Sequence, residues 1–325
     1  MNRVTMQTIA DQLGVSKYAV SRSLSGKDGV SETTRQTVER AANELGYIAP
    51  SLLASARTLQ LVLHDHDPVN SEVQLRIQRG IQRTAERHGY PVQMQWTHDM
   101  RRIGELTRNG AGTILVGPHV PLPPHTSQRR PTPMVKVGLI APLEAIDQVD
   151  VGANEATAAL GLKLLDYGHR DVVFLQGRGH LRGRTGRYRA LRDVFADAGA
   201  REVLELYFDE DGGFLDAFEA LQATGRKPTV LVAGNDWIAV AVISDLLRAG
   251  INVPGDISVV GYGDYAAAVQ TKPQLTTIRV PGEEMGAAAF ELLREGIEQR
   301  TDPRRAPRRL VIAPTVVERQ SLARL

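Results

Sequence analysis

Residues 15–24 of the chain read Val15-Ser16-Lys17-Tyr18-Ala19-Val20-Ser21-Arg22-Ser23-Leu24. Ser16 is a favourable N-cap for a short helix, and the helical period then places Val20 and Leu24 on one inward face. The outward face of this helix carries Lys17, Tyr18, Ser21 and Arg22. The stretch therefore predicts a short helix that turns polar side chains toward a partner.

A second predicted helix precedes this one. Residues 6–13 follow Thr5, a good N-cap, and Gly14 supplies a tight turn after them. Three apolar residues fall on one face of the upstream helix: Ile9, Ala10 and Leu13. Helix, glycine turn and second helix form a helix-turn-helix pattern. The same pattern also fits an ordinary helical pair whose polar faces meet water.

The outward side chains suit double-stranded DNA. An arginine at position 22 can bind guanine O6 and N7 with its forked guanidinium, and Lys17 and Tyr18 can reach base edges. Three hydroxyl residues are candidates for phosphate contacts: Thr5, Ser16 and Ser21.

These residues belong to a longer run with familiar spacing, made up of Thr8–Asp11, Gly14–Ser16, Val20–Arg22, Leu24–Gly26, Val30–Arg35 and Glu44–Tyr47. The run resembles the lactose-repressor (LacI/GalR) family of bacterial regulators. Later segments resemble the same family: Gly168–Arg170, Ala233–Asp236, Val253–Tyr262, Pro273–Ile278 and a closing strand within Leu310–Ser321. The resemblance implies a homodimeric regulator that binds a near-palindromic operator and responds to a small molecule.

Length and composition bound these expectations. The chain has 325 residues, a net charge of +2 and no cysteine, so disulfide and thiol chemistry are excluded. The sequence contains neither an apolar leader nor an apolar run of membrane-spanning length, which favours a cytoplasmic, nucleoid-associated protein without a membrane contact. DNA affinity would then depend on a dimer and on directed contacts.

A third helix is predicted from Ser31, as N-cap, to about Leu45, and a linker follows it. In the family this linker forms a hinge helix on DNA, where a leucine wedges into the minor groove. The linker here, residues 51–58, is several residues shorter than the family pattern. Leu53 is the candidate wedge and Leu52 the second candidate; the alternative is that both pack against the third helix.

From residue 59 onward, predicted strands and helices alternate, which indicates parallel sheets with helices on both faces. We expect strands at 59–63, 92–96, 112–116, 134–137, 172–175, 203–208, 230–232 and 257–260, and helices at 73–88, 154–167, 187–198, 215–222 and 236–248. The predicted fold is an N-terminal all-α helix-turn-helix domain (1–50), the hinge, and an α/β periplasmic-binding-protein-like core of two doubly wound lobes (59–325). We expect the first lobe to hold about 59–165 and 281–307, and the second about 166–280 and 308–325.

Ligands in such sheets bind at the carboxyl ends of the strands. The resemblance places Arg184, within Gly183–Leu191, at the position that grips the effector, and Asn235 at a second contact. Val73 and Gln74 lie where the family lines the cleft from the first lobe. Trp237 or Phe214 is a substitute for a missing platform aromatic, and Asp236 is a candidate cap for the following helix.

Two acidic positions that bind sugar hydroxyls in the family are absent. Ala153 and Gly263 stand in their places, which leaves Asp264 alone. Between 178 and 192 the chain carries six arginines and no acidic residue: Arg178, Arg182, Arg184, Arg187, Arg189 and Arg192. This balance favours an anionic effector, a sugar acid first and a sugar phosphate second, although about four of these arginines are expected to face solvent. The 279–286 stretch and Gly263 resemble the gluconate-type branch.

Other chemistry is not favoured. His64-Asp65-His66-Asp67 is interpreted as a charged loop and not as a metal site, and no cofactor is predicted. The chain lacks a recognisable serine–histidine–acid constellation, so an enzyme is not expected. The alternative of a solute-binding transport component on the same core fold would require a signal peptide and no helix-turn-helix.

Overall fold

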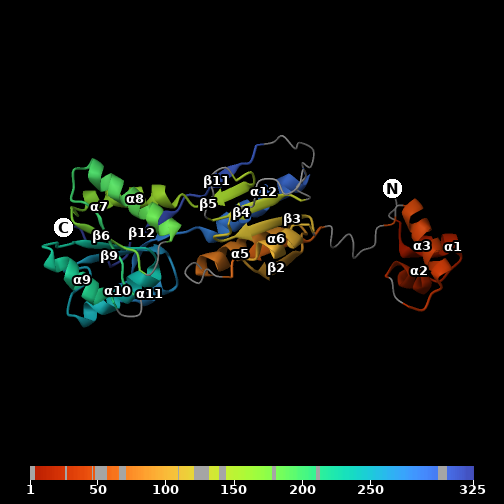
Figure 1. Cartoon of the computed structure of the whole chain (residues 1–325), viewed down its shortest axis with the longest axis horizontal. Helices are drawn as coiled ribbons and strands as arrows, with labels where there is room; N and C mark the ends of the chain where they lie inside the picture. The colour runs from red at the N-terminus through yellow and green to blue at the C-terminus, as the bar shows by residue number, and fades with distance from the viewer. Residues whose placement is uncertain are drawn as a thin grey trace.

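The computed structural model describes residues 4–25, 28–45, 47, 57–65, 71–108, 110–120, 132–138, 144–177, 181–209, 213–298 and 306–325. It contains an N-terminal three-helix domain and two six-stranded sheets flanked by helices (Figure 1). The predicted fold class is confirmed. The proposed hinge and its leucines, Leu52 and Leu53, lie outside the described residues.

The N-terminal domain consists of α1 (Met6–Leu13), α2 (Lys17–Leu24) and α3 (Glu32–Glu44). The predicted caps are present: Thr5 Oγ1 accepts from the Thr8 amide at 3.2 Å and Ser16 Oγ from the Ala19 amide at 3.1 Å. Ser31 Oγ accepts from the Thr34 amide at 3.1 Å in the same way. Gly14 ends α1 in the left-handed conformation, with φ of 65°. The three helices bury a small shared core: Ile9, Ala10, Val20, Val38, Ala41 and Ala42.

The first lobe is built on one sheet in the order β11-β5-β4-β3-β1-β2. Its strands are β1 (Leu59–Leu63), β2 (Val92–Trp96), β3 (Gly112–Val116), β4 (Met134–Val137), β5 (Asp147–Asp150) and β11 (Arg309–Val311). All of its neighbouring strands are parallel. The helices of this lobe are α5 (Ser71–Arg87), α6 (Met100–Leu106) and α12 (Gly282–Glu298). Central strands β1 and β3 are buried along their whole length, as expected for a parallel sheet covered on both faces.

The second lobe repeats the plan in the order β12-β10-β9-β8-β6-β7. Its strands are β6 (Val172–Leu175), β7 (Leu204–Leu206), β8 (Val230–Ala233), β9 (Ser258–Gly263), β10 (Thr276–Arg279) and β12 (Thr315–Val317). Its helices are α7 (Ala153–Asp166), α8 (Arg182–Asp197), α9 (Phe214–Ala223), α10 (Asp236–Arg248) and α11 (Ala267–Gln270). The last strand, β12, runs antiparallel to β10.

The lobe boundaries differ from the predicted ones. α7 packs against α8 and so belongs to the second lobe, whereas residues up to 165 were expected in the first. β11 pairs with β5 and therefore belongs to the first lobe, although it lies beyond residue 307. The closing segment is thus two short strands in different sheets and not one strand. The chain crosses between the lobes near residues 151–152, 280–281 and 312–314.

Helices α5 and α12 cross at unusually short range in the first lobe. A Cβ at Gly80 of α5 would lie 2.0 Å from the Glu283 carbonyl oxygen of α12. A Cβ at Gly286 would lie 2.1 Å from the Ile77 carbonyl oxygen. Glycine at both positions lets the two backbones touch, which fixes α5 at the edge of the cleft.

Candidate functional site

The outward face of α2 carries the residues predicted to read DNA. Lys17 and Tyr18 are exposed, and Ser21 and Arg22 are half-buried. The Arg22 guanidinium carbon lies 5.1 Å from the centre of the Tyr18 ring, so the two side chains form one polar and aromatic surface. Thr5 and Ser16 stand at the N-termini of α1 and α2, where the helix dipole favours phosphate.

A cavity of about 230 Å³ lies between the two lobes. This volume is below the range of typical drug-sized sites, so the cavity suits a single small molecule. The first lobe contributes α5 and the ends of β3, β4 and β5, and the second contributes the start of α8 and the ends of β8 and β9. Of the predicted effector contacts, Val73, Gln74 and Arg184 line this cavity.

Arg184 is buried at the cavity wall, with only 2% of its surface exposed. Its Nη1 donates to the Gln176 backbone oxygen. The side chain passes over Gly234, where an added Cβ would lie 2.8 Å from the arginine Cδ, so only glycine allows this approach. The end of β8 thus holds Arg184 in position.

Arg187, one helical turn further along α8, lines the same cavity. Its guanidinium carbon lies 3.8 Å from the centre of the Tyr262 ring, and Nη2 donates to the Gly234 oxygen at 2.6 Å. Burial lowers the pKa of Arg187, and the nearby Tyr262 and Tyr265 partly oppose this. Neither Arg187 nor Tyr262 was predicted as a site residue. Arg182, Arg189 and Arg192 are exposed, as expected for most of this group, whereas Arg178 lies outside the described part of the chain.

Asp150, at the end of β5, is an acidic residue on the cavity wall that the sequence did not indicate. Its Oδ2 accepts from Arg309 of β11, and its Oδ1 accepts from the Val151 amide at 2.8 Å. The carboxylate is therefore already balanced by a guanidinium from its own lobe.

Two predicted effector contacts do not line the cavity. Asn235 caps α10, with Oδ1 accepting from the Ile238 amide at 2.9 Å, and it is 3% exposed. Trp237 is 52% exposed and lies beside the Tyr265 ring, with ring centres 6.2 Å apart. The cavity lining does not include either residue, and their contacts with the effector stay predictions. The predicted platform alternative, Phe214, is buried in the core of the second lobe.

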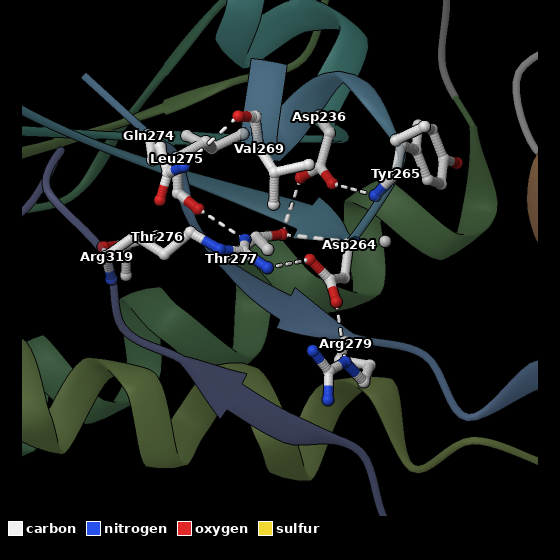
Figure 2. Close-up of polar contacts among 12 residues, drawn as sticks. Asp236, Asp264, Tyr265, Val269, Gln274, Leu275, Thr276, Thr277, Arg279 and Arg319 are labelled. Carbon is white, nitrogen blue, oxygen red and sulfur yellow. Dashed lines mark hydrogen bonds and ion pairs between the residues drawn. The ribbon is translucent and has the colours of Figure 1, made fainter. Parts of the chain in front are cut away.

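Asp236 does not cap α10 as predicted, because Asn235 takes that role. It is fully buried, and its carboxylate accepts from Thr277 Oγ1 and from the Tyr265 amide, each at 2.6 Å (Figure 2). Burial raises the pKa of Asp236 to about 6, although these two hydrogen bonds act in the opposite direction. The residue therefore joins α10 to β10 and to the loop that follows β9.

Asp264 has a similar structural role. Its carboxylate binds Arg279 and Arg319, each at 2.6 Å (Figure 2). Burial raises the pKa of Asp264, but the hydrogen bonds from the two arginines outweigh it and leave the pKa lowered. Neighbouring Gly263 has φ of 128°, and a Cβ there would lie 2.2 Å from the Tyr265 ring. A carboxylate at position 263 would not fit this arrangement. Ala153, the other position at which the family's acid is absent, lies on the cavity wall.

A pair of α5 side chains joins the lobes beside the cavity. Arg76 Nη1 donates to the Gly263 oxygen at 3.1 Å, and Nη2 to the Asp264 oxygen. Glu72 Oε1 accepts from the Ala266 amide at 2.9 Å and pairs with Arg76 at 2.6 Å. The contacted groups on the second lobe all belong to the backbone. The contacts therefore depend on the path of the loop at residues 263–266 and not on its side chains.

Histidines gather at the carboxyl edge of the first sheet. The His64 and His119 ring centres lie 5.1 Å apart, and Lys136 forms a buried ion pair with Glu144 at 3.0 Å nearby, also donating to the His119 oxygen at 2.8 Å. Burial, together with His64, lowers the pKa of His119 to about 4. Among the residues that the structure describes, no group of three or more His, Asp or Glu could hold a metal ion. His66 and Asp67 lie outside that part.

The chain is similar to known protein families and to known regulators. Residues 5–50 match the family described as bacterial regulatory proteins, lacI family, and residues 162–322 match the periplasmic binding protein-like domain. The ribose operon repressor of Escherichia coli (strain K12) is 30% identical, over 98% of this chain and 99% of its own length. Catabolite control protein A of Priestia megaterium is 26% identical, over 92% and 94%.

Solved structures agree with this fold. The complex of the transcriptional regulator CelR with cellobiose is 25% identical, with a TM-score of 0.66 over 98% of this chain and all of that chain, 100%. The lac repressor dimer bound to operator and the anti-inducer ONPF is 20% identical, with a TM-score of 0.68 over 99% and 100%. At that identity the second likeness shows the fold alone. No helix in the described ranges has the length and hydropathy needed to cross a membrane.

Proposed function

The chain belongs to the LacI family of bacterial regulatory proteins, and from this premise we propose that it is a repressor that binds operator DNA as a homodimer. Each protomer inserts α2 into the major groove of one half of a near-palindromic operator. The observation that carries this proposal is the outward surface of Lys17, Tyr18 and Arg22 on a helix fixed by the Ser16 cap. Such a protein acts at the nucleoid in the cytoplasm and needs no catalytic residue.

The DNA-reading assignment can be tested at a single side chain. Arg22→Ala should weaken operator binding by about 1–3 kcal/mol and flatten the base preference at one position per half-site. Arg40→Ala, an exposed arginine of α3 in the same domain, is the control and should leave that preference intact. A selection from random DNA for each variant gives the binding-site logo. A logo unchanged by Arg22→Ala would disprove the assignment.

The proposed effector is a small anion that binds in the cavity between the lobes, with a sugar acid first and a sugar phosphate second. The support is Arg184, a buried guanidinium at the cavity wall whose fork can bind a carboxylate or phosphate through two hydrogen bonds. Among the described residues, the acid on the wall is Asp150, which is held by Arg309 and does not oppose an anion with a free charge. The names of two relatives refer to ribose and to cellobiose, and these names describe those proteins. The anionic effector of this chain is our own proposal.

Closure of the lobes around the ligand would exclude water, strengthen the ion pair and shift the dimer between DNA-competent and incompetent forms. Arg184→Gln should therefore retain operator binding without effector and lose the response to effector. Calorimetry against gluconate-like acids, sugar phosphates and neutral hexoses tests the class of ligand. Tight binding of a neutral hexose, without binding of any acid or phosphate, would refute the anionic assignment.

A further inference from the structure

Arg187 is a buried cation whose hydrogen-bonding capacity is only partly used. It is 9% exposed, Nη2 donates to the Gly234 oxygen, and its guanidinium stacks on Tyr262. Its Nε is buried without a hydrogen-bond partner. Buried donors of this kind are rare in folded proteins, and an ion that binds at the site is one explanation for them.

The electrostatic surroundings of Arg187 lead to the same conclusion. Within the described ranges Arg187 forms no ion pair, and its charged state is favoured by Tyr262, by Tyr265 and by one carbonyl dipole. Removing a guanidinium from water is costly unless a counter-charge replaces the lost hydration. Asp150, the acid on the same cavity wall, is already paired with Arg309. An anionic ligand would supply the counter-charge that the described protein groups do not.

The start of α8 provides a second group of donors at the same place. This helix has 16 residues, and its N-cap, Leu181, offers no side-chain hydrogen bond to the first turn. Leu181, Arg182 and Gly183 all line the cavity. A Cβ at Gly183 would lie 3.7 Å from Arg187 Nη1, so the guanidinium lies beside the first turn. Backbone amides at the positive end of a helix and a buried guanidinium therefore meet at one end of the cavity.

We propose that Arg187 and the first turn of α8 form an oxyanion receptor, and that the acid group of the effector binds there. Apolar side chains of the first lobe take the carbon skeleton, through Val73 and Ile77 of α5 and Met285 of α12. The inference rests on the proposed function and adds to it a second arginine beside Arg184. The receptor selects ligands with a terminal carboxylate or phosphate over neutral sugars of the same size.

The test compares Arg187→Met, which keeps the length of the side chain, with Arg189→Met at an exposed position of the same helix. Calorimetry would use potassium gluconate, 6-phosphogluconate and glucose, and scanning calorimetry would give the melting temperature of each free protein. For Arg187→Met we expect an acid that the wild type binds to be bound about 10- to 100-fold more weakly. The melting temperature without ligand should be unchanged or higher, because a buried charge has been removed. Arg187→Lys should recover part of the affinity, and Arg189→Met should match the wild type.

The outcomes separate this inference from the function on which it rests. If Arg187→Met binds acids as tightly as wild type while Arg184→Gln does not, the receptor is wrong and the anionic effector stands. A lower melting temperature with unchanged affinity assigns Arg187 a structural role and also overturns the receptor. If the wild type binds glucose and neither acid, both proposals fail together.

Discussion

The crossing of α5 and α12 makes a sharp prediction about stability. Gly80→Ala would place a methyl group 2.0 Å from the Glu283 carbonyl oxygen, whereas ordinary contacts begin at 3.4 Å. The helices would have to separate by about 1.4 Å, the difference between these distances. The obstacle is backbone on both sides, so rotation of a side chain cannot relieve it.

The expected loss follows from two opposed effects. Overpacking costs about 1–3 kcal/mol, and a rigid backbone contact belongs at the upper end of that range. Alanine in place of a helical glycine returns about 1 kcal/mol. We therefore expect Gly80→Ala to lower the free energy of unfolding by about 2 kcal/mol. The control is Gly104→Ala in α6, where a methyl group meets no atom within 4 Å. That change should stabilise by about 0.5–1 kcal/mol.

Urea denaturation followed by circular dichroism measures both variants. Effector affinity should also fall in Gly80→Ala, because α5 carries Val73 and Gln74 on the cavity wall. If Gly80→Ala proves as stable as the wild type, the close approach of the helices does not constrain the lobe. If Gly104→Ala also lowers the free energy of unfolding, the expected gain from helix propensity is wrong, and not the expected cost of the contact.

Two further predictions concern pH, and one concerns the hinge. Folding lowers the pKa of His119 from 6.5 to about 4, so the unfolded chain binds the proton at a higher pH than the folded protein does. The free energy of unfolding should therefore drop by up to about 3 kcal/mol as the pH falls through this window. His119→Phe should remove that drop in urea titrations at pH 7 and 4.5. Folding raises the pKa of Asp236 from 3.8 to about 6, so its contribution to stability is present at low pH and is lost as the pH rises through 6. Relative to Asp236→Asn, the free energy of unfolding of the wild type should increase by up to about 3 kcal/mol from pH 7 to pH 4. Leu53→Ala should reduce operator affinity and DNA bending together in circular-permutation gel shifts.

Each of these results can be contradicted. An identical pH dependence in the wild type and His119→Phe would mean that this imidazole is not kept neutral by burial. A difference between wild type and Asp236→Asn that stays constant with pH would remove the Asp236 assignment. An equal bend for Leu53→Ala would place the wedge at another residue, Leu52 being the next candidate, or show that this short linker does not wedge.

The N-terminal domain could be predicted from sequence because its determinants are local. Thr5, Ser16 and Ser31 cap the helices that they precede, and Gly14 takes the left-handed conformation that a turn at this point requires. Capping depends on residues three positions apart, so it is visible in the sequence without any tertiary information. The exposure of the α2 surface follows from the same helical period.

The cavity could be predicted only in part. Arg184 is located by the resemblance, but the sequence does not single out Arg187 among the six arginines, and the predicted helix starts at 187. The helix starts at Arg182, since Gly183 and Gly186 are helical and do not form a loop. With that start, Arg184 and Arg187 are three residues apart and share a face, which was the available signal. Asp150 lacks such a signal, because its place on the wall depends on sheet order.

Neighbouring residues at the end of β8 show a different limit. Asn235 and Asp236 are both plausible caps and plausible ligands, and the sequence does not distinguish them. The structure distinguishes them by what lies opposite: the α10 amide for Asn235, and Thr277 and Tyr265 for Asp236. Those partners lie 29 and 41 positions away from Asp236, beyond the reach of local patterns.

Because the chain crosses between the lobes three times, the N-terminal domain and the two sheets are completed in a fixed order during synthesis on the ribosome. The helices of the N-terminal domain are complete once residue 44 has emerged, and they can fold at once. Neither sheet is complete at any intermediate length, because β11 and β12, residues 309–317, form the edge of one sheet each. Until then both sheets present an open edge strand, β5 in one and β10 in the other. A nascent chain would thus carry a complete DNA-binding domain beside two incomplete sheets. At this stage chaperones have the most exposed sheet edge to protect.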